Sequence, residues 1–215
     1  MTPEDKAFCN KVLQLALCNP EMAWNTLDLT ERVLSEGIPG DLAECGVFAG
    51  THPAIMAYVL MKHGITDRKV HLFDSFEGIP KAQAHEHPND LKTLGKGRLG
   101  VIESSGVSVC SLEGVKGYMK MWGIDPTLLV YHKGWFQNTL KNHGILKLAL
   151  LRIDCDLYDS TIPVLQHLYP CVQPGGYVID DDLGSPTCRQ AVVDILGAMP
   201  KKLNFVSAGT HWWRV

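Results

Sequence analysis

Short apolar runs alternate along this chain with longer amphipathic segments, and polar or glycine-containing turns separate them. The main runs cover residues 42–45, 70–73, 128–131, 148–153 and 176–180. Nearly unbroken apolar runs are typical of strands buried on both faces, as in parallel sheets covered by helices. The alternation therefore predicts an α/β fold with a Rossmann-like, doubly wound, mostly parallel sheet. Two last runs, 203–206 and 211–215, predict a closing pair of strands and an antiparallel edge strand.

The beginning of the chain carries a helical pattern instead. Apolar positions at helical spacing occupy residues 8–17 and 24–34, and Pro20 lies between the two stretches. We therefore expect an N-terminal helical extension, residues 1–37, followed by one α/β domain, residues 38–215. Packing against the core is the first expectation for the extension, and contact with a partner chain or coverage of a substrate are the alternatives.

Carboxylates gather where two of the predicted strands end. Asp154 and Asp156 follow one apolar run, and Asp181 and Asp182 follow the next. Ligands of doubly wound sheets bind beyond the carboxyl ends of the strands. Because crowded like charges repel unless a cation or a proton offsets them, these residues predict a hard divalent metal, Mg²⁺ or Mn²⁺.

The first predicted strand leads into a glycine-containing turn, ECGVFAG at residues 44–50, and then into a helix. Glycine lets the backbone approach a ligand closely, and a helix N-terminus offers free amides. The turn does not match GxGxxG, which counts against NAD. Glu44 suits a cationic or hydroxylated ligand. Asp74, at the end of the second strand, is placed either to bind ribose hydroxyls or to cap a turn.

Two later segments add candidates. Residues 76–107 are long, polar and irregular, which predicts a mobile lid over a substrate. His85 and His87 in this segment are more typical of a solvated loop than of metal ligands. Trp135, beyond the third strand, offers a flat face to a nucleobase, with a place in the core as the alternative.

Composition narrows the function classes. The chain has 215 residues, enough for one α/β domain, and its net charge of −3 gives no electrostatic case for binding nucleic acid or anionic membranes. No apolar run approaches a membrane span, and the N-terminus lacks a signal-peptide core, so we expect a cytoplasmic protein. The seven cysteines are scattered and never spaced CxxC, as expected of reduced thiols. The chain lacks a GxxxxGK[ST] loop, which argues against an ATPase.

Several blocks in matched order and spacing resemble the macrocin O-methyltransferase family (TylF-type, including the mycinamicin and novobiocin sugar methyltransferases). The blocks are IPGDLAECGVFAG, HLFDSFEGIP, KGWFQNTL, LLRIDCDLYDST, LYPCVQPGGYVIDDD and CRQAV. The resemblance implies a class I S-adenosylmethionine-dependent methyltransferase domain over residues 38–215. It also implies Mg²⁺, or Mn²⁺, as a second cofactor. The expected reaction moves a methyl group to a hydroxyl of a small molecule, a sugar or diol of a natural product.

The resemblance further implies roles for individual residues. The cofactor would be held by the glycine turn, the end of the second strand and the segment after the third: Glu44, Cys45, Gly46, Val47, Gly50, Asp74, Ser75, Gly134 and Trp135. The metal ligands would be Asp154, Asp181 and Asp182, with Asp156 as the base that takes the hydroxyl proton.

Two residues depart from the family pattern. Asp180 adds a third acid before the expected pair, so it could replace Asp181 or Asp182 as a ligand. Ala49 stands where the family often has arginine. Three histidines are alternative bases, although each is more typical of a structural residue: His52, His132 and His211.

Two other functions fit some of the same residues. A metal-dependent phosphatase or hydrolase would use the aspartates to activate water, but it would not need Glu44, Asp74 or Trp135. A catalytically inactive, nucleoside-binding homologue would keep the fold and the pocket. The expected partner is a small-molecule hydroxyl acceptor, with no nucleic acid and no membrane, and the N-terminal helices leave room for a homo-oligomer.

Overall fold

Seven strands form a single sheet in the computed structural model, which describes residues 1–215. They are β1 (Asp41–Cys45), β2 (Val70–Asp74), β3 (Leu129–Lys133), β4 (Leu148–Ile153), β5 (Val172–Asp180), β6 (Asn204–Ser207) and β7 (Thr210–Arg214). Their order across the sheet is β3-β2-β1-β4-β5-β7-β6. Strands β1 to β5 pair in parallel, whereas β7 pairs antiparallel with both β5 and β6. This order confirms the predicted doubly wound, mostly parallel sheet that ends in an antiparallel hairpin.

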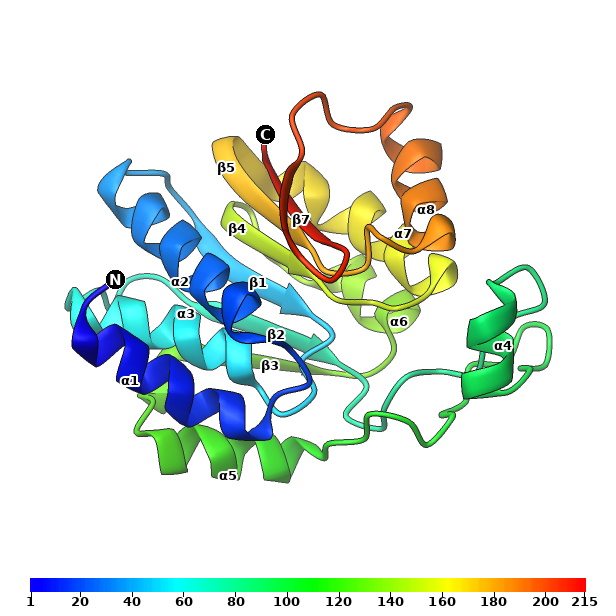
Figure 1. The fold of residues 1–215 in the computed structure, drawn as a ribbon, viewed down its shortest axis with the longest axis horizontal. Coiled ribbons are helices and arrows are strands. Elements are labelled where there is room, and N and C mark those ends of the chain that lie inside the picture. The colour runs from blue at the N-terminus through cyan, green and yellow to red at the C-terminus, as the bar shows by residue number, and fades with distance from the viewer.

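Helices cover both faces of this sheet. They are α1 (Pro3–Val12), α2 (Pro20–Ser35), α3 (Thr51–Lys62), α4 (Pro88–Leu94), α5 (Leu112–Trp122), α6 (Phe136–Thr139), α7 (Tyr158–His167) and α8 (Pro186–Leu196). Figure 1 shows α1, α2, α3 and α5 on one face and α6, α7 and α8 on the other, with α4 standing apart. None of these helices combines the length and the apolarity that crossing a membrane requires.

Side-chain alternation along the strands separates two cores. Leu42 and Leu150 pack into the core on the α1–α3 face, whereas Ala43 and Leu151 pack into the core on the α7–α8 face. Successive side chains of a strand point to opposite faces, so a strand covered on both sides needs apolar residues throughout. This is the reason for the uninterrupted apolar runs in the sequence.

The N-terminal helices belong to the first of these cores. Cys9 of α1 and Leu27 of α2 are no more than 2% exposed and lie in the same buried cluster as α3. Asp5 of α1 accepts hydrogen bonds from Lys62 Nζ (2.9 Å) and Tyr58 OH (3.1 Å) of α3. The extension therefore packs on the sheet layer, while the proposed boundary after residue 37 stays a prediction.

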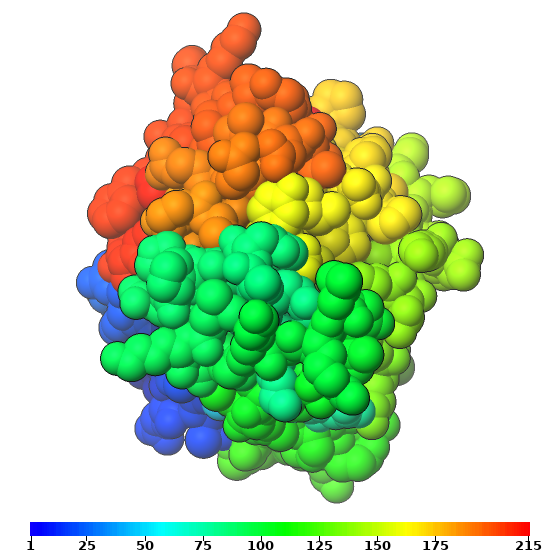
Figure 2. All heavy atoms as spheres, turned by 90° about the vertical axis from the view of Figure 1, so that its right-hand side faces the viewer, coloured from blue at the N-terminus to red at the C-terminus, as the bar shows by residue number.

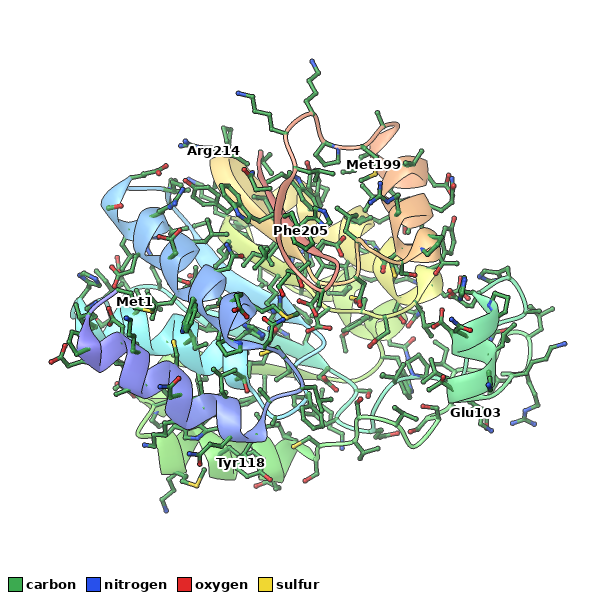
Figure 3. The ribbon with its side chains drawn as sticks, viewed as in Figure 1. Met1, Glu103, Tyr118, Met199, Phe205 and Arg214 are labelled. Atoms are coloured by element: carbon green, nitrogen blue, oxygen red, sulfur yellow. The ribbon has the colours of Figure 1, made fainter.

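The segment between β2 and α5 has a small core of its own. It contains the short helix α4, and Ala82 and Leu94 form a buried cluster with Leu157 at the start of α7. Figure 2 shows residues 76–107 as a continuous green cover on this face, next to α7 and α8, and Figure 3 places Glu103 at its outlying end. The predicted lid, residues 76–107, is thus a packed segment with its own small core, and it is not irregular throughout.

One buried carboxylate anchors this lid. Glu86 accepts hydrogen bonds from the backbone N–H groups of Tyr158 and Asp159, each at 3.0 Å. These residues open α7, whose N-cap Leu157 makes no side-chain cap of its own. The first N–H groups of a helix need an external acceptor, so Glu86 supplies the missing cap and ties the lid to the sheet edge.

The working edge of the sheet is aligned by one repeated backbone hydrogen bond. At four places, the residue that follows one strand donates its N–H to the last or the second-last carbonyl of a neighbouring strand. These 2.9 Å bonds run from Gly46 to Phe73, from Asp154 to Cys45, from Asp181 to Ile153 and from Gly134 to Asp74. Residues far apart in sequence are therefore held at a common level along this edge.

Gly46 is the closest approach at this edge, and its substitution tests the alignment. Its φ is +87°, and an added Cβ would lie 1.7 Å from the carbonyl oxygen of Asp154. We expect Gly46→Ala to lower the free energy of unfolding by about 3 kcal/mol or more, because strain and a clash add. Gly64→Ala is the matched control, since its φ is +65° and nothing lies within 4 Å of an added Cβ. It should cost only about 1 kcal/mol in urea denaturation, and equal losses would contradict the close approach.

Candidate active site

A cavity of about 230 Å³ opens at the carboxyl ends of the parallel strands. Most of the predicted site residues line it: Glu44, Gly46, Val47, Asp74, Ser75, Trp135, Asp154, Asp156, Asp181 and Asp182. Residues 16–18, between α1 and α2, also form part of the wall. The sequence carried no local signal for these three, although covering a substrate was one role considered for the extension.

Three of the predicted cofactor residues lie outside the wall of the cavity. The Cys45 side chain is buried in the core on the α7–α8 face. Gly50 is the N-cap of α3, with a φ of +91° and Met119 packed against it. Gly134 follows β3 with a φ of +140°. Their backbones shape the turns, and their side-chain positions face away from the cavity or are filled by neighbours.

A buried guanidinium links the predicted carboxylates. Arg152 on β4 has no exposed surface. Its Nε donates to Glu44 Oε1 at 2.8 Å, and its Nη2 donates to Asp154 Oδ2 at 2.9 Å and to Asp181 Oδ1 at 2.8 Å. One cation thus joins β1, the end of β4 and the end of β5.

Arg152 is absent from the predicted site residues, although the sequence carries a signal for it. An arginine inside the apolar run LALLRI lies two residues before Asp154, so alternation places both side chains on the same face of the strand. Arg152 also lies directly beside Glu44 in the register of β1 and β4. The sequence suggested that crowded acids need a bound cation, and the structure shows that the chain itself supplies one.

Arg152 and the Glu44 carboxylate stabilise each other in the interior. Burial raises the pKa of Glu44, and the neighbouring Arg152 charge opposes this rise. Burying two charges is unfavourable unless their geometry is good and their remaining polar atoms find partners. Glu44 Oε2 has no such partner in the protein, which leaves a buried acceptor at the cavity wall.

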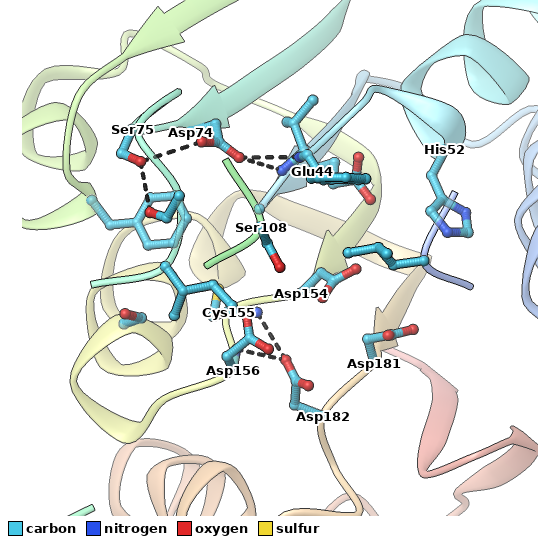
Figure 4. Close-up of a pocket in the computed structure, with 18 of the residues that line it drawn as sticks. Glu44, His52, Asp74, Ser75, Ser108, Asp154, Cys155, Asp156, Asp181 and Asp182 are labelled. Carbon is cyan, nitrogen blue, oxygen red and sulfur yellow. Dashed lines mark hydrogen bonds between the residues drawn. The ribbon is translucent and has the colours of Figure 1, made fainter. Parts of the chain in front are cut away.

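The three predicted metal ligands converge. Ligand oxygens of Asp154, Asp181 and Asp182 lie within 4.8 Å of one another, and Figure 4 shows the three side chains around a common space. Asp182 is held differently from the other two, because its Oδ2 accepts the N–H groups of Cys155 (2.9 Å) and Asp156 (2.7 Å). Each of the three carboxylates keeps one oxygen without a hydrogen-bond partner: Asp154 Oδ1, Asp181 Oδ2 and Asp182 Oδ1. Such an all-carboxylate set suits a hard divalent cation.

Asp180 does not join this group. It is 1% exposed and does not line the cavity, because alternation along β5 turns it to the α7–α8 face together with Val178. Its Oδ1 accepts the N–H of Asp182 at 3.0 Å, and its Oδ2 has no partner. Burial, and then the charge of Asp182, raises its pKa to about 8. The structure thus places Asp181 and Asp182, rather than Asp180, at the cavity.

Asp156, the predicted base, lies in the wall beside the carboxylate cluster. Its φ of +62° is unusual for a residue other than glycine and turns the chain back towards the cavity. Burial, and then the charges of Asp182 and Asp181, raises its pKa to about 8. A carboxylate with a pKa near neutrality is able to exchange protons at physiological pH.

Asp74 caps the glycine turn. Its Oδ2 accepts the N–H groups of Val47 (2.6 Å) and Phe48 (3.3 Å), and its Oδ1 accepts that of Phe76 (2.6 Å). Burial raises its pKa. Of the two roles considered for this residue, the structure shows the turn cap, while the carboxylate also faces the cavity near Ser75 (Figure 4).

The histidines considered as bases fall in different places. His52 lines the cavity, whereas His132 and His211 do not. The His132 ring stacks on Phe73 at 3.9 Å between centroids. His211 Nδ1 lies 2.7 Å from the carbonyl oxygen of Gly209. Only His52 therefore remains in reach of a ligand in this cavity.

Comparisons with known proteins point to one family. The family model described as Macrocin-O-methyltransferase (TylF) matches residues 22–214. The chain is 40% identical over 167 residues to the 8-demethyl-8-(2,3-dimethoxy-alpha-L-rhamnosyl)-tetracenomycin-C 4'-O-methyltransferase of Streptomyces olivaceus, which covers 78% of this chain and 62% of that protein. It is 32% identical over 193 residues to the Mycinamicin III 3''-O-methyltransferase of Micromonospora griseorubida, which covers 88% of this chain and 74% of that protein.

A solved structure resembles this fold closely. The O-methyltransferase NovP superposes with a TM-score of 0.81 at 32% sequence identity, over 93% of this chain and 81% of that chain. The matched part of the present chain spans less than two thirds of the length of the Streptomyces olivaceus relative.

Removal of Arg152 tests its role as the internal cation. Arg152→Met would leave the buried Glu44, Asp154 and Asp181 without their cation, so that they must repel one another or take up protons, and we expect the free energy of unfolding to fall by about 3–5 kcal/mol. Adding Glu44→Gln should recover about 1–2 kcal/mol of this loss in a double-mutant cycle measured by denaturant unfolding. Arg32→Met, at a side chain 45% exposed and paired with Asp28, is the control and should cost less than about 1 kcal/mol. Additive losses at the two buried positions would contradict the coupling.

Asp180 predicts a pH dependence of stability with a defined sign. Its pKa rises from 3.8, its ordinary value, to about 8 in the folded protein, so only the folded state keeps the proton between these pH values. The stability that the protonated Asp180 gives the folded state is therefore fully present below pH 3.8 and is lost as the pH rises through about 8. Relative to the parent, Asp180→Asn should gain roughly 1–3 kcal/mol of stability between about pH 5 and about pH 8.5 in urea unfolding. A difference that does not change with pH would mean that Asp180 is ionised in the folded state, and Asp28→Asn on the surface is the control.

Proposed function

Because the chain belongs to the macrocin O-methyltransferase (TylF) family of S-adenosylmethionine-dependent methyltransferases, we propose that it methylates a hydroxyl group of a small natural product with the help of Mg²⁺. The observation that carries this proposal is the convergence of three strand-end aspartates with the glycine turn on one cavity. A hydrolase using the same aspartates would have no ligand for the side of the cavity that Glu44, Asp74 and Trp135 line.

The cofactor side of the cavity would hold S-adenosylmethionine, whose sulfonium supplies the methyl group and leaves as a neutral thioether. The residues that would hold it there are Glu44, Gly46, Val47, Asp74, Ser75 and Trp135. The unpartnered Glu44 Oε2 is a fitting feature, because an acidic wall complements a cationic ligand. Since the departing group is neutral, no residue has to donate a proton to it.

The carboxylate side would hold Mg²⁺ through Asp154, Asp181 and Asp182. A cation bound there supplies Lewis-acid chemistry, orienting neighbouring oxygens of the acceptor and lowering the pKa of its hydroxyl. Arg152 fixes one oxygen each of Asp154 and Asp181 and leaves the other free. Backbone N–H groups fix Asp182 in the same manner. The ligands are thus oriented by the protein before any ion binds.

Asp156 would accept the proton of the attacking hydroxyl. It lies two residues after Asp154 in the wall of the same cavity. Burial and the neighbouring Asp182 and Asp181 carboxylates raise its pKa, so its ionised form is a stronger base than an ordinary carboxylate. The backbone N–H of Asp156 donates to Asp182 Oδ2, and this bond keeps the proposed base next to a proposed metal ligand. Removing this carboxylate should therefore affect turnover rather than cofactor binding.

The acceptor is expected to be a sugar or a diol of a natural product. The name of the Streptomyces olivaceus relative specifies a rhamnosyl-bearing compound, and that of the Micromonospora griseorubida relative specifies mycinamicin III. A rhamnosyl group is a sugar, and a sugar can offer neighbouring oxygens to one cation. We extend this substrate class to the present chain.

Calorimetric titration with S-adenosylhomocysteine and with Mg²⁺ tests the proposal. Wild-type protein should bind both, and Asp154→Ala should weaken Mg²⁺ binding at least about tenfold, because one of three ligands is lost. Its affinity for S-adenosylhomocysteine should change less than about threefold. Asp180→Asn is the matched control, since this neighbouring acid faces away from the cavity, and it should bind Mg²⁺ as the wild type does. Failure of the wild type to bind the nucleoside would rule out a methyltransferase, and unchanged Mg²⁺ binding by Asp154→Ala would rule out the metal site.

A further inference from the structure

His52 turns an unpartnered ring nitrogen towards the cavity. It is the second residue of α3, is 5% exposed and lines the cavity wall. Its Nδ1 lies 2.9 Å from Thr26 Oγ1, whereas its Nε2 has no hydrogen-bond partner in the protein. Figure 4 shows the ring descending from α3 on the side of the cavity where Glu44 and Asp181 lie. A buried polar atom without a partner is unfavourable, so this nitrogen points to a ligand atom.

The hydrogen bonds around Thr26 define the proton state of this ring. Thr26 has a single hydroxyl proton, which it donates to the carbonyl of Met22 at 3.2 Å, as Thr30 does to the carbonyl of Thr26 at 2.7 Å. With that proton on the Met22 bond, we assign His52 Nδ1 as the donor to Thr26 Oγ1. Burial, and then the charge of Arg152, lowers the pKa of His52 well below its ordinary value and keeps the ring neutral. Nε2 therefore carries a lone pair and acts as an acceptor.

A second unpartnered acceptor lines the same wall. Glu44 Oε1 is occupied by Arg152, but Glu44 Oε2 is buried and free. No lysine or arginine lines the cavity. Two free acceptors in a wall without a cationic side chain are complementary to a donor-rich, positively charged group on the ligand. A primary ammonium group, with three N–H donors, has this chemistry.

We propose that His52 is a further cofactor-binding residue, whose Nε2 accepts a hydrogen bond from the α-ammonium group of the methionine part of S-adenosylmethionine, with Glu44 Oε2 as the second acceptor. This inference rests on the proposed function. His52 lies at the first turn of α3, directly after the glycine turn that would hold the same cofactor. The residue would select ligands that keep the amino-acid part.

Two nucleosides that differ in this part test the assignment. S-Adenosylhomocysteine contains the amino-acid group, and 5′-methylthioadenosine lacks it. By calorimetry, His52→Ala should weaken S-adenosylhomocysteine binding about tenfold and change 5′-methylthioadenosine binding less than about twofold, since one charge-assisted hydrogen bond is lost. His52→Gln should recover part of the loss through its amide oxygen. His63→Ala, at the exposed end of α3, is the control and should alter neither affinity.

Each other outcome has a defined meaning. Unchanged S-adenosylhomocysteine binding by His52→Ala, with normal binding by the wild type, overturns this inference alone. Equal losses for the two nucleosides also overturn it, because they would indicate a change in cavity shape. A wild type that binds neither nucleoside overturns the proposed function together with the inference.

A spectroscopic measurement on the wild type covers the case in which the variants do not fold. In ¹⁵N-histidine NMR spectra, His52 should show the Nδ1–H tautomer, and adding S-adenosylhomocysteine should shift its Nε2 resonance. The Nε2–H tautomer in the complex, or no shift of Nε2, would contradict the acceptor role.

Discussion

A single buried guanidinium determines how the carboxyl edge of this sheet is built. Arg152 lies beneath the edge with no exposed surface and pairs with Glu44 in β1, with Asp154 just after β4 and with Asp181 just after β5. Without an internal cation, these acids would repel one another in a poorly solvated place. The large desolvation cost of the arginine is offset because three partners surround it within hydrogen-bond distance. The carboxylates can therefore stand close together and still be ordered.

In the same network, one oxygen of each carboxylate is held by the protein and the other is free to bind a ligand. Arg152 takes one oxygen of Asp154 and one of Asp181, and backbone N–H groups take one oxygen of Asp182. The remaining oxygens face the cavity, where they form the proposed metal site. On the other side of the cavity, Glu44 follows the same principle, with one oxygen on Arg152 and the other free. Orientation and binding are thus carried out by different atoms of the same side chains.

Much of the fold could be predicted from local patterns. The apolar runs at residues 70–73 and 148–153 predict two strands, and the observed bounds, Val70–Asp74 and Leu148–Ile153, agree to within one residue. Arg152 could not be assigned to the site from the sequence, because one polar residue does not change the strand pattern of an apolar run. Most of its partners also lie beyond its own strand, at or after the neighbouring strands. The lid was predicted as irregular because Glu86, which caps α7, is separated from that helix by about 70 residues of sequence.

The sequence by itself determined which residues end the strands and turn towards a ligand edge, because periodicity, glycine turns and helix caps act over a few neighbouring residues. Only the tertiary structure decided that Asp181 faces the cavity while Asp180 faces the opposite core, and that His52 keeps a free nitrogen. Those outcomes depend on strand register and on hydrogen bonds between segments that meet only when the sheet and its helices pack together.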